Sequence, residues 1–157
     1  MTENKNKEPK REVSSHEQKR TFVEDIEVPE HIERSESNEF RQSKEQLKKD
    51  GHDHCFICGT DKNLQVHHFL CEWSLSNDCD EQKLREMAKI FDPYGYGKQW
   101  DDKPITMDSL PNLLVLCQEH HTHPESGIHC LPFNEWIMQR LCKTGDDPVI
   151  EDNKKTT

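Results

Sequence analysis

Two pairs of metal-binding residues constrain the fold of this chain more than any other feature of its sequence. Cys55 and Cys58 are separated by two residues, and the same spacing recurs between Cys117 and His120. Thiolates and imidazoles at this spacing are typical of a tetrahedral structural zinc site. Such a site would join two segments that lie far apart in the sequence, so it would decide which parts of the chain meet.

The composition indicates that the fold needs this staple. Of the 157 residues, 31% are hydrophobic and 33% are charged, which leaves few apolar side chains for a large core. We therefore expect one small domain that depends on structural Zn²⁺. His52 and His54 lie just before the first cysteine pair, and either could replace His120 as the fourth ligand.

The sequence also bears on where the protein works. No apolar run is long enough to span a membrane and the first residues are hydrophilic, so we expect neither a membrane segment nor a signal peptide. Both expectations favour a cytoplasmic protein. In that reducing compartment, the seven cysteines are better interpreted as metal ligands and free thiols than as disulfides.

Composition divides the chain into three regions. Residues 1–36 are charged and lack apolar periodicity, which predicts a disordered tail, with residues 21–26 as a possible docking segment for a protein partner. Residues 37–145 form the expected domain, and residues 146–157 a second disordered tail. Within the domain, residues 71–108 are interpreted as an insertion between two strands.

The expected strands and helices make this an α+β domain. Residues 63–70 alternate in polarity and predict a strand, residues 113–116 predict its partner, and a helical turn should begin near Gln118. Helices are expected at residues 37–50 and 134–143, the second with Trp136, Ile137 and Leu141 facing inward. In the insertion, Asp78 and Glu81 predict the start of a helix, whose spaced apolar residues are Leu84, Met87, Ala88 and Phe91.

A second group of polar residues surrounds the zinc pairs. Adjacent side chains of a strand point to opposite faces, so His67 and His68 cannot easily bind one ion together. That division suits two tasks, with one imidazole on a metal and the other free to take a proton from water. The remaining members of the group are Asn112, His121 and His129.

In these motifs the chain resembles the HNH (His-Asn-His) endonucleases, over about residues 55–129. Val66-His67-His68 is similar to the first-strand motif of that family, and Asn112 to the family asparagine. Cys117-x-x-His120-His121 resembles the family Cys-x-x-Cys-His, with His120 in place of the second zinc cysteine. The resemblance implies a small ββα-metal, treble-clef-like core, braced by a structural zinc and flanked by helices and disordered tails.

The resemblance also implies a role for each residue. His67, His121 and His129 would bind the catalytic metal, His68 would be the general base, and Asn112 would fix the loop and orient that base. Pro124 interrupts any helix after His121, because proline lacks the N–H group and clashes with the preceding turn. The last ligand must then come from a loop, and we expect His129 rather than His123 to be that ligand.

The implied function is a metal-dependent endonuclease that cleaves double-stranded DNA to 5′-phosphate and 3′-hydroxyl ends. Histidine ligands do not select among Mg²⁺, Mn²⁺, Ni²⁺ and Zn²⁺ as the catalytic ion. The net charge of −10 argues against tight non-specific binding to nucleic acid. A non-catalytic zinc-binding interaction or inhibitory protein is therefore an alternative, and an RNA-directed nuclease is a weaker one.

Overall fold

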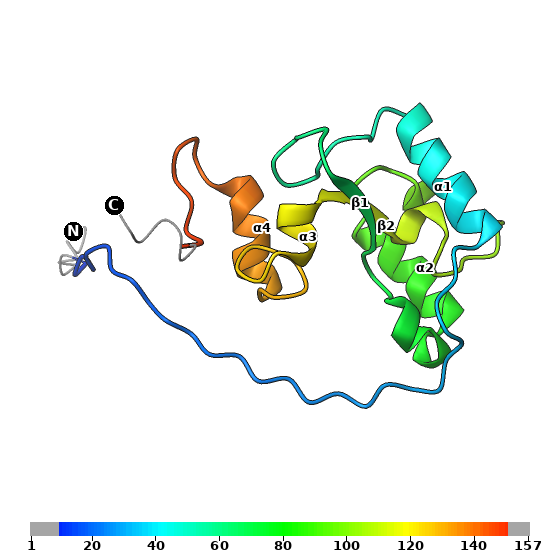
Figure 1. Cartoon of the computed structure of the whole chain (residues 1–157), viewed down its shortest axis with the longest axis horizontal. Helices are drawn as coiled ribbons and strands as arrows, with labels where there is room; N and C mark the ends of the chain where they lie inside the picture. The colour runs from blue at the N-terminus through cyan, green and yellow to red at the C-terminus, as the bar shows by residue number, and fades with distance from the viewer. Residues whose placement is uncertain (1–9, 151–157) are drawn as a thin grey trace, which may run out of the picture.

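A two-stranded antiparallel sheet lies at the centre of the computed structural model, which describes residues 10–150 (Figure 1). Strand β1 (Leu64–His68) pairs with β2 (Leu113–Cys117), and the register places Leu64 opposite Cys117. Helix α3 (Gln118–Thr122) follows β2 directly. The α+β class and both expected strands are confirmed.

The first strand is shorter at both ends than the expected residues 63–70. Asn63 has a φ of 53°, which is left-handed backbone and cannot extend a strand. At the other end, the N–H groups of Leu70 and Cys71 donate to the side-chain oxygen of Asn112 instead of to β2. Side-chain chemistry therefore ends β1, and a polarity pattern does not contain that information.

The strand β2 is buried on both faces, and each face packs against a different helix. Leu114 and Leu116 contact the fully buried Trp136 of helix α4 (Phe133–Leu141). Leu113 and Val115 pack instead with the apolar side of helix α1 (Asn38–Lys49). Every residue of β2 is consequently held between two layers, so the residues at its ends are fixed in position.

The helices of the domain match the expected ones except in detail. The side-chain oxygen of Ser37 accepts a hydrogen bond from the N–H of Phe40 and so caps α1, as expected for a helix beginning at residue 37. In α4, Leu141 is 63% exposed, so its predicted inward position is wrong. Phe133, where α4 begins, brings its ring against Trp136 at a centroid separation of 5.8 Å.

The insertion forms a small core of its own. It contains the 3₁₀ helices η1 (Trp73–Asp78) and η2 (Gly97–Gln99) together with helix α2 (Glu81–Ile90), and a third 3₁₀ helix, η3 (Leu110–Asn112), follows it and leads into β2. Asp80, not Asp78, caps α2, because its carboxylate accepts from the N–H of Lys83. The expected apolar side of α2 is buried only in part, since Met87 and Phe91 are exposed; the buried core residues are Cys71, Leu84, Ala88 and Ile105.

Residues 10–37 form no helix or strand, yet parts of this segment contact the domain. Figure 1 shows it running past the domain from the side of α4 to the start of α1. Arg20 pairs with Glu135 of α4, and the carbonyl of Ile32 accepts a hydrogen bond from the indole of Trp73 at 3.1 Å. The outer parts of both expected tails, residues 1–9 and 151–157, lie outside the described residues. None of the helices in residues 10–150 has the length and apolar character needed to cross a membrane.

The burial of Trp136 gives a direct test of this packing. Its indole is fully buried and donates to the carbonyl of His120 at 2.8 Å, so Trp136→Ala should lower the free energy of unfolding by about 3–5 kcal/mol. Phe133→Ala, at the exposed start of the same helix, should cost much less. Chemical denaturation of both variants measures the difference, and equal losses would contradict the packing described above.

Candidate metal centres

Three thiols and one imidazole converge between the Cys55–Cys58 turn and the end of β2. Their ligand atoms all lie within 4.8 Å of one another; the four residues are Cys55, Cys58, Cys117 and His120. The sulfurs of Cys58 and Cys117 are 3.9 Å apart, and Nδ1 of His120 lies 3.2 Å from the sulfur of Cys117. Tetrahedral zinc with bonds of about 2.3 Å to sulfur requires ligand separations of about 3.8 Å. The cluster therefore fits a metal ion such as zinc.

Backbone hydrogen bonds shape the turn that carries the first two sulfurs. The N–H of Cys55 donates to Thr60, and Gly59 donates back to Cys55, each at 2.8 Å. Gly59 has a φ of 77°, a conformation that residues with a side chain rarely adopt. The N–H of Phe56 then donates to the carbonyl of Val115 and attaches the turn to β2.

The fourth ligand is His120, and the structure leaves the two alternative histidines elsewhere. His52 stacks on the ring of Tyr94 with a centroid separation of 4.3 Å. Neither His52 nor His54 belongs to the Cys₃His cluster. His120 reaches it because α3 begins at Gln118, one residue after Cys117, so one turn of helix brings its imidazole back to that sulfur.

The electrostatics of the cluster also favour a cation. Burial raises the pKa of Cys117 to about 12. Burial acts in the same direction on Cys55, but the His120 imidazole and backbone donors outweigh it and lower the pKa of Cys55 to about 6. One thiolate is therefore stabilised without an ion, and a divalent cation would supply the charge that lets the other thiols ionise.

A second cluster contains three imidazoles, contributed by β1, α3 and the loop that follows α3. Nε2 of His121 lies 3.2 Å from Nδ1 of His67 and 3.1 Å from Nε2 of His129. The three rings lie at centroid separations of 4.9–5.0 Å. Below we call these residues the histidine trio. Three nitrogens turned toward one point suit a metal ion with further coordination positions left open.

The loop returns to the trio through an unusually close backbone approach. A Cβ atom on Gly127 would lie 2.6 Å from the carbonyl oxygen of His121, so only glycine fits there. Next to it, the N–H of Ile128 donates to the carbonyl of His120 at 3.0 Å. These contacts bring His129 beside His121 although eight residues separate them.

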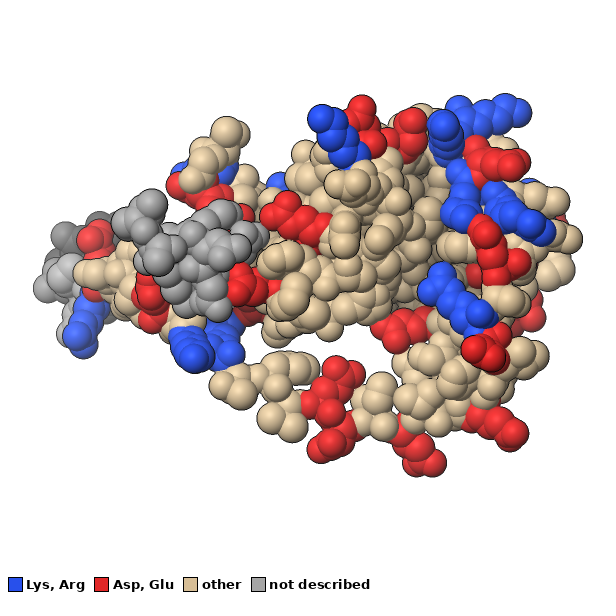
Figure 2. Space-filling model, in the orientation of Figure 1, with Lys and Arg blue, Asp and Glu red and all other residues tan. Residues whose placement is uncertain are grey.

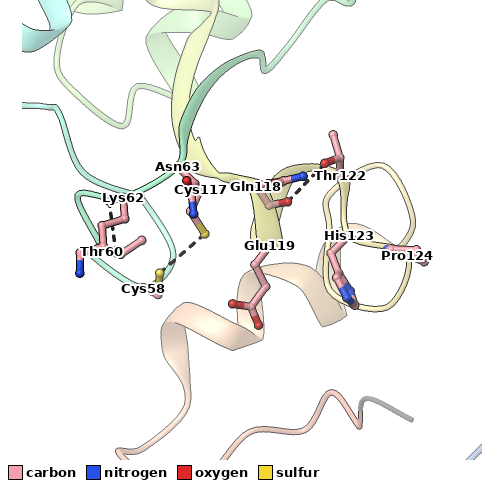
Figure 3. Close-up of a pocket in the computed structure, with 10 residues that line it drawn as sticks. All are labelled: Cys58, Thr60, Lys62, Asn63, Cys117, Gln118, Glu119, Thr122, His123 and Pro124. Carbon is pink, nitrogen blue, oxygen red and sulfur yellow. Dashed lines mark hydrogen bonds between the residues drawn. The ribbon is translucent and has the colours of Figure 1, made fainter. Parts of the chain in front are cut away.

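His123, the alternative to His129, lies away from the trio. Figure 3 shows it along a shallow hollow that also contains Cys58, Cys117 and Glu119. Its Nδ1 accepts a hydrogen bond from the N–H of Glu125 at 3.2 Å. The structure thus brings His129, and not His123, together with His67 and His121.

Two polar residues outside the trio lie beside its rings, and sequence reasoning missed both. Oε1 of Gln65 accepts a hydrogen bond from Nδ1 of His121 at 2.7 Å, whereas Oε1 of Glu72 lies 3.9 Å from Nδ1 of His129, beyond hydrogen-bond distance. Gln65 keeps the proton of His121 on Nδ1 and leaves the Nε2 lone pair for a metal. The two-residue period of a strand could have identified Gln65, because it shares a face of β1 with His67. No pattern in the sequence points to Glu72.

The pKa values of two trio residues favour the binding of a metal cation. Burial, together with neighbouring positive groups, lowers the pKa of His67 to about 3 and that of His121 to about 4. Both imidazoles are therefore neutral near pH 7 and offer a lone pair. Nitrogen donors of this kind suit Zn²⁺ and Ni²⁺ better than Mg²⁺, so the donor set fits a borderline divalent ion.

His68, the expected general base, lies on the other face of β1. Its Nε2 is 2.8 Å from Oδ1 of Asp108, its side chain is only 6% exposed, and Phe40 stacks on its ring. The second carboxylate oxygen of Asp108 accepts from the hydroxyl of Ser37 at 2.7 Å. Sequence reasoning missed Asp108, which lies forty residues from its partner.

Asn112 does not contact His68 through its side chain. The buried amide accepts from the N–H groups of Leu70 and Cys71 and donates to the carbonyls of Cys71 and Met107. Asn112 therefore fastens the loop at the end of β1, as expected. Asp108, rather than Asn112, contacts the His68 ring directly.

Comparisons with protein-family models, with curated proteins and with solved structures found no match to this chain. The function is therefore argued from the two clusters themselves.

The Cys₃His cluster predicts that metal binding and folding are one event. Cys58→Ser should release the ion and unfold much of the domain, because the binding energy of a structural zinc is folding energy. Cys142→Ser, which lies outside the cluster, is the matched control. Elemental analysis and circular dichroism measure both effects, and a metal-free but folded Cys58→Ser protein would contradict a structural zinc.

The lowered pKa values predict how the trio binds metal in mild acid. A site with two imidazoles of ordinary pKa would lose about 100-fold in metal affinity one pH unit below that pKa, because protons compete with the ion for both nitrogens. Protonation of His67 and His121 should cost almost no metal affinity at such a pH, because their folded pKa values of about 3 and about 4 keep both imidazoles neutral. The advantage should disappear only as the pH falls through those values.

Calorimetric titration of metal at pH 7.5 and 5.5 measures this dependence, provided that the cysteine cluster stays loaded. Proton release by His67 and His121 at pH 5.5 would show that burial does not keep them neutral.

Proposed function

We propose that this chain is a metal-dependent DNA endonuclease of the HNH type, with a ββα-metal core, that hydrolyses phosphodiester bonds to 5′-phosphate and 3′-hydroxyl ends. The observation that supports this most is the convergence of three imidazoles, two of them with lowered pKa values, beside a separate Cys₃His cluster. Four protein ligands close a structural site, whereas three leave room for water and substrate. A chain that only needed a staple would have no use for the trio.

His67, His121 and His129 would hold the catalytic ion, with Mg²⁺, Mn²⁺, Ni²⁺ and Zn²⁺ as candidates. When bound there, a divalent ion polarises a phosphoryl oxygen and makes water easier to ionise. Gln65 keeps the proton of His121 on the nitrogen that points away from the ion. The protein thus presents lone pairs in a fixed geometry before substrate arrives.

His68 would take the proton from the attacking water. With the Nε2 proton donated to Asp108, the lone pair lies on Nδ1, which has no hydrogen-bond partner in residues 10–150. The Asp108 carboxylate also stabilises the imidazolium that forms when His68 accepts a proton. Asn112 supports this arrangement indirectly, because it holds the chain immediately after His68.

Double-stranded DNA is the proposed substrate, although the protein has few charges to attract it. Figure 2 shows acidic and basic side chains intermixed around the visible face, with a largely uncharged centre. The net charge is −10. Binding would therefore depend on the metal ion and a few nearby cations more than on a broad basic surface.

A second function, a non-catalytic zinc-binding interaction protein, is favoured by the burial of His68. A base that is 6% exposed and hydrogen-bonded to Asp108 also fits a purely structural role. In that case His68 and Asp108 would connect β1 to the start of α1 through Ser37, and the net negative charge would suit a protein partner.

Cleavage of a plasmid by the purified protein, with each candidate ion in turn, separates the two functions. His68→Ala should reduce the rate by about 10²–10⁴ while the trio still binds metal, because only the base is lost. His67→Ala should abolish metal binding at the trio together with cleavage. His123→Ala is the matched control and should cleave like the wild type.

The result for wild type decides whether the protein is an enzyme. No cleavage with any ion would favour the interaction protein. Full activity of His68→Ala would keep the nuclease but remove His68 as its base.

A further inference from the structure

Arg34 is an exposed cation in the segment that leads into α1. Its guanidinium lies 5.6 Å from the centroid of the Phe40 ring, and that ring stacks on His68. Two hydrogen bonds attach the preceding residues to η1: Trp73 donates to the carbonyl of Ile32, and Asn77 donates to that of Glu30. Arg34 is therefore held against the folded domain on both sides of its position in the chain.

The same attachments bring Arg34 close to the histidine trio. Helix η1 begins immediately after Glu72, whose carboxylate lies 3.9 Å from His129. The Phe40 ring beneath the Arg34 guanidinium stacks on His68, which follows His67 directly in β1. Arg34 therefore lies beside the proposed base, and its segment packs against the element that follows Glu72.

Arg34 has no carboxylate partner in residues 10–150, where neither a hydrogen bond nor an ion pair involves its guanidinium. The other cation over the Phe40 ring, Lys44, is paired with Glu36. A planar guanidinium carries parallel N–H donors that match two oxygens of one phosphate group. An unpaired arginine beside a metal centre is thus suited to bind phosphate, in a protein whose net charge of −10 otherwise repels it.

We propose that Arg34 is a catalytic residue that binds the non-bridging oxygens of the scissile phosphodiester at the histidine trio. The inference rests on the proposed function and adds a substrate contact to it. The segment before α1 is then part of the active site and not only a solubilising tail. Because the contact is to phosphate, it would act alike on all DNA sequences.

The test compares Arg34→Ala and Arg34→Lys with Arg11→Ala, a control that removes the same charge from the same segment. Loss of a charge-assisted hydrogen bond should lower kcat/KM of Arg34→Ala about 10- to 100-fold. Arg34→Lys should recover part of this loss, since it keeps the charge but not the planar fork. The thermal midpoint should stay near the wild-type value, and the metal affinity of the trio should not fall, because Arg34 is a positive charge that does not bind the ion.

Duplex binding provides a readout that a merely structural role would not change. Fluorescence anisotropy with a labelled oligonucleotide and no added divalent ion measures affinity across a range of salt concentrations. Removing one phosphate contact should reduce the slope of log affinity against log salt by about 1 in Arg34→Ala, and by nothing in Arg11→Ala.

The possible results distinguish this inference from the function on which it rests. Wild-type cleavage with an unchanged rate and salt slope in Arg34→Ala would overturn the inference and leave the nuclease intact. Equal losses in Arg11→Ala would show that net charge alone explains the effect, and they would also overturn the inference. A wild-type protein that does not cleave would remove the proposed function and the inference together.

Discussion

The contact among the three thiols and His120 is the interaction on which the rest of the structure depends. It attaches the Cys55–Cys58 turn to the junction between β2 and α3. Helix α3 has only five residues, far below the length at which an isolated helix is stable in water. The direction of α3, and hence of His121, is thus set by the cluster and by Trp136. An ion in the Cys₃His cluster would therefore fix the helix that carries His121, a member of the histidine trio.

Adjacent residues serve the two clusters on α3, and this adjacency separates their chemistry. His120 is buried and turns back toward Cys117, whereas His121 turns toward His67 on β1. Cysteine sulfurs dominate one cluster, and imidazole nitrogens make up the other. Soft ligands favour zinc strongly, whereas the all-nitrogen set leaves more ions admissible. Under the proposed function, ligand type alone would distinguish a permanent zinc ion from an exchangeable catalytic ion.

The sequence predicted those features that depend on spacing and polarity, and missed those that depend on long-range approach. The cysteine pairs, both strands and the helix capped by Ser37 follow from local patterns. The contact between His68 and Asp108 joins residues forty positions apart, and no periodicity connects them. The position of Arg34 could not be predicted either, because its segment has no regular structure and only contacts with η1 and Phe40 attach it to the domain.

The four hydrogen bonds of Asn112 have a consequence for how such a chain can change over time. They bring the two ends of the insertion together, since Cys71 and Met107 both bond to the same amide. Residues between those ends contribute no ligand to either cluster. The entropy of closing a loop grows only slowly with its length. The length of this stretch can therefore change at little entropic cost while Asn112 keeps its two ends together, provided that the contact of Tyr94 with Val115 of β2 is kept.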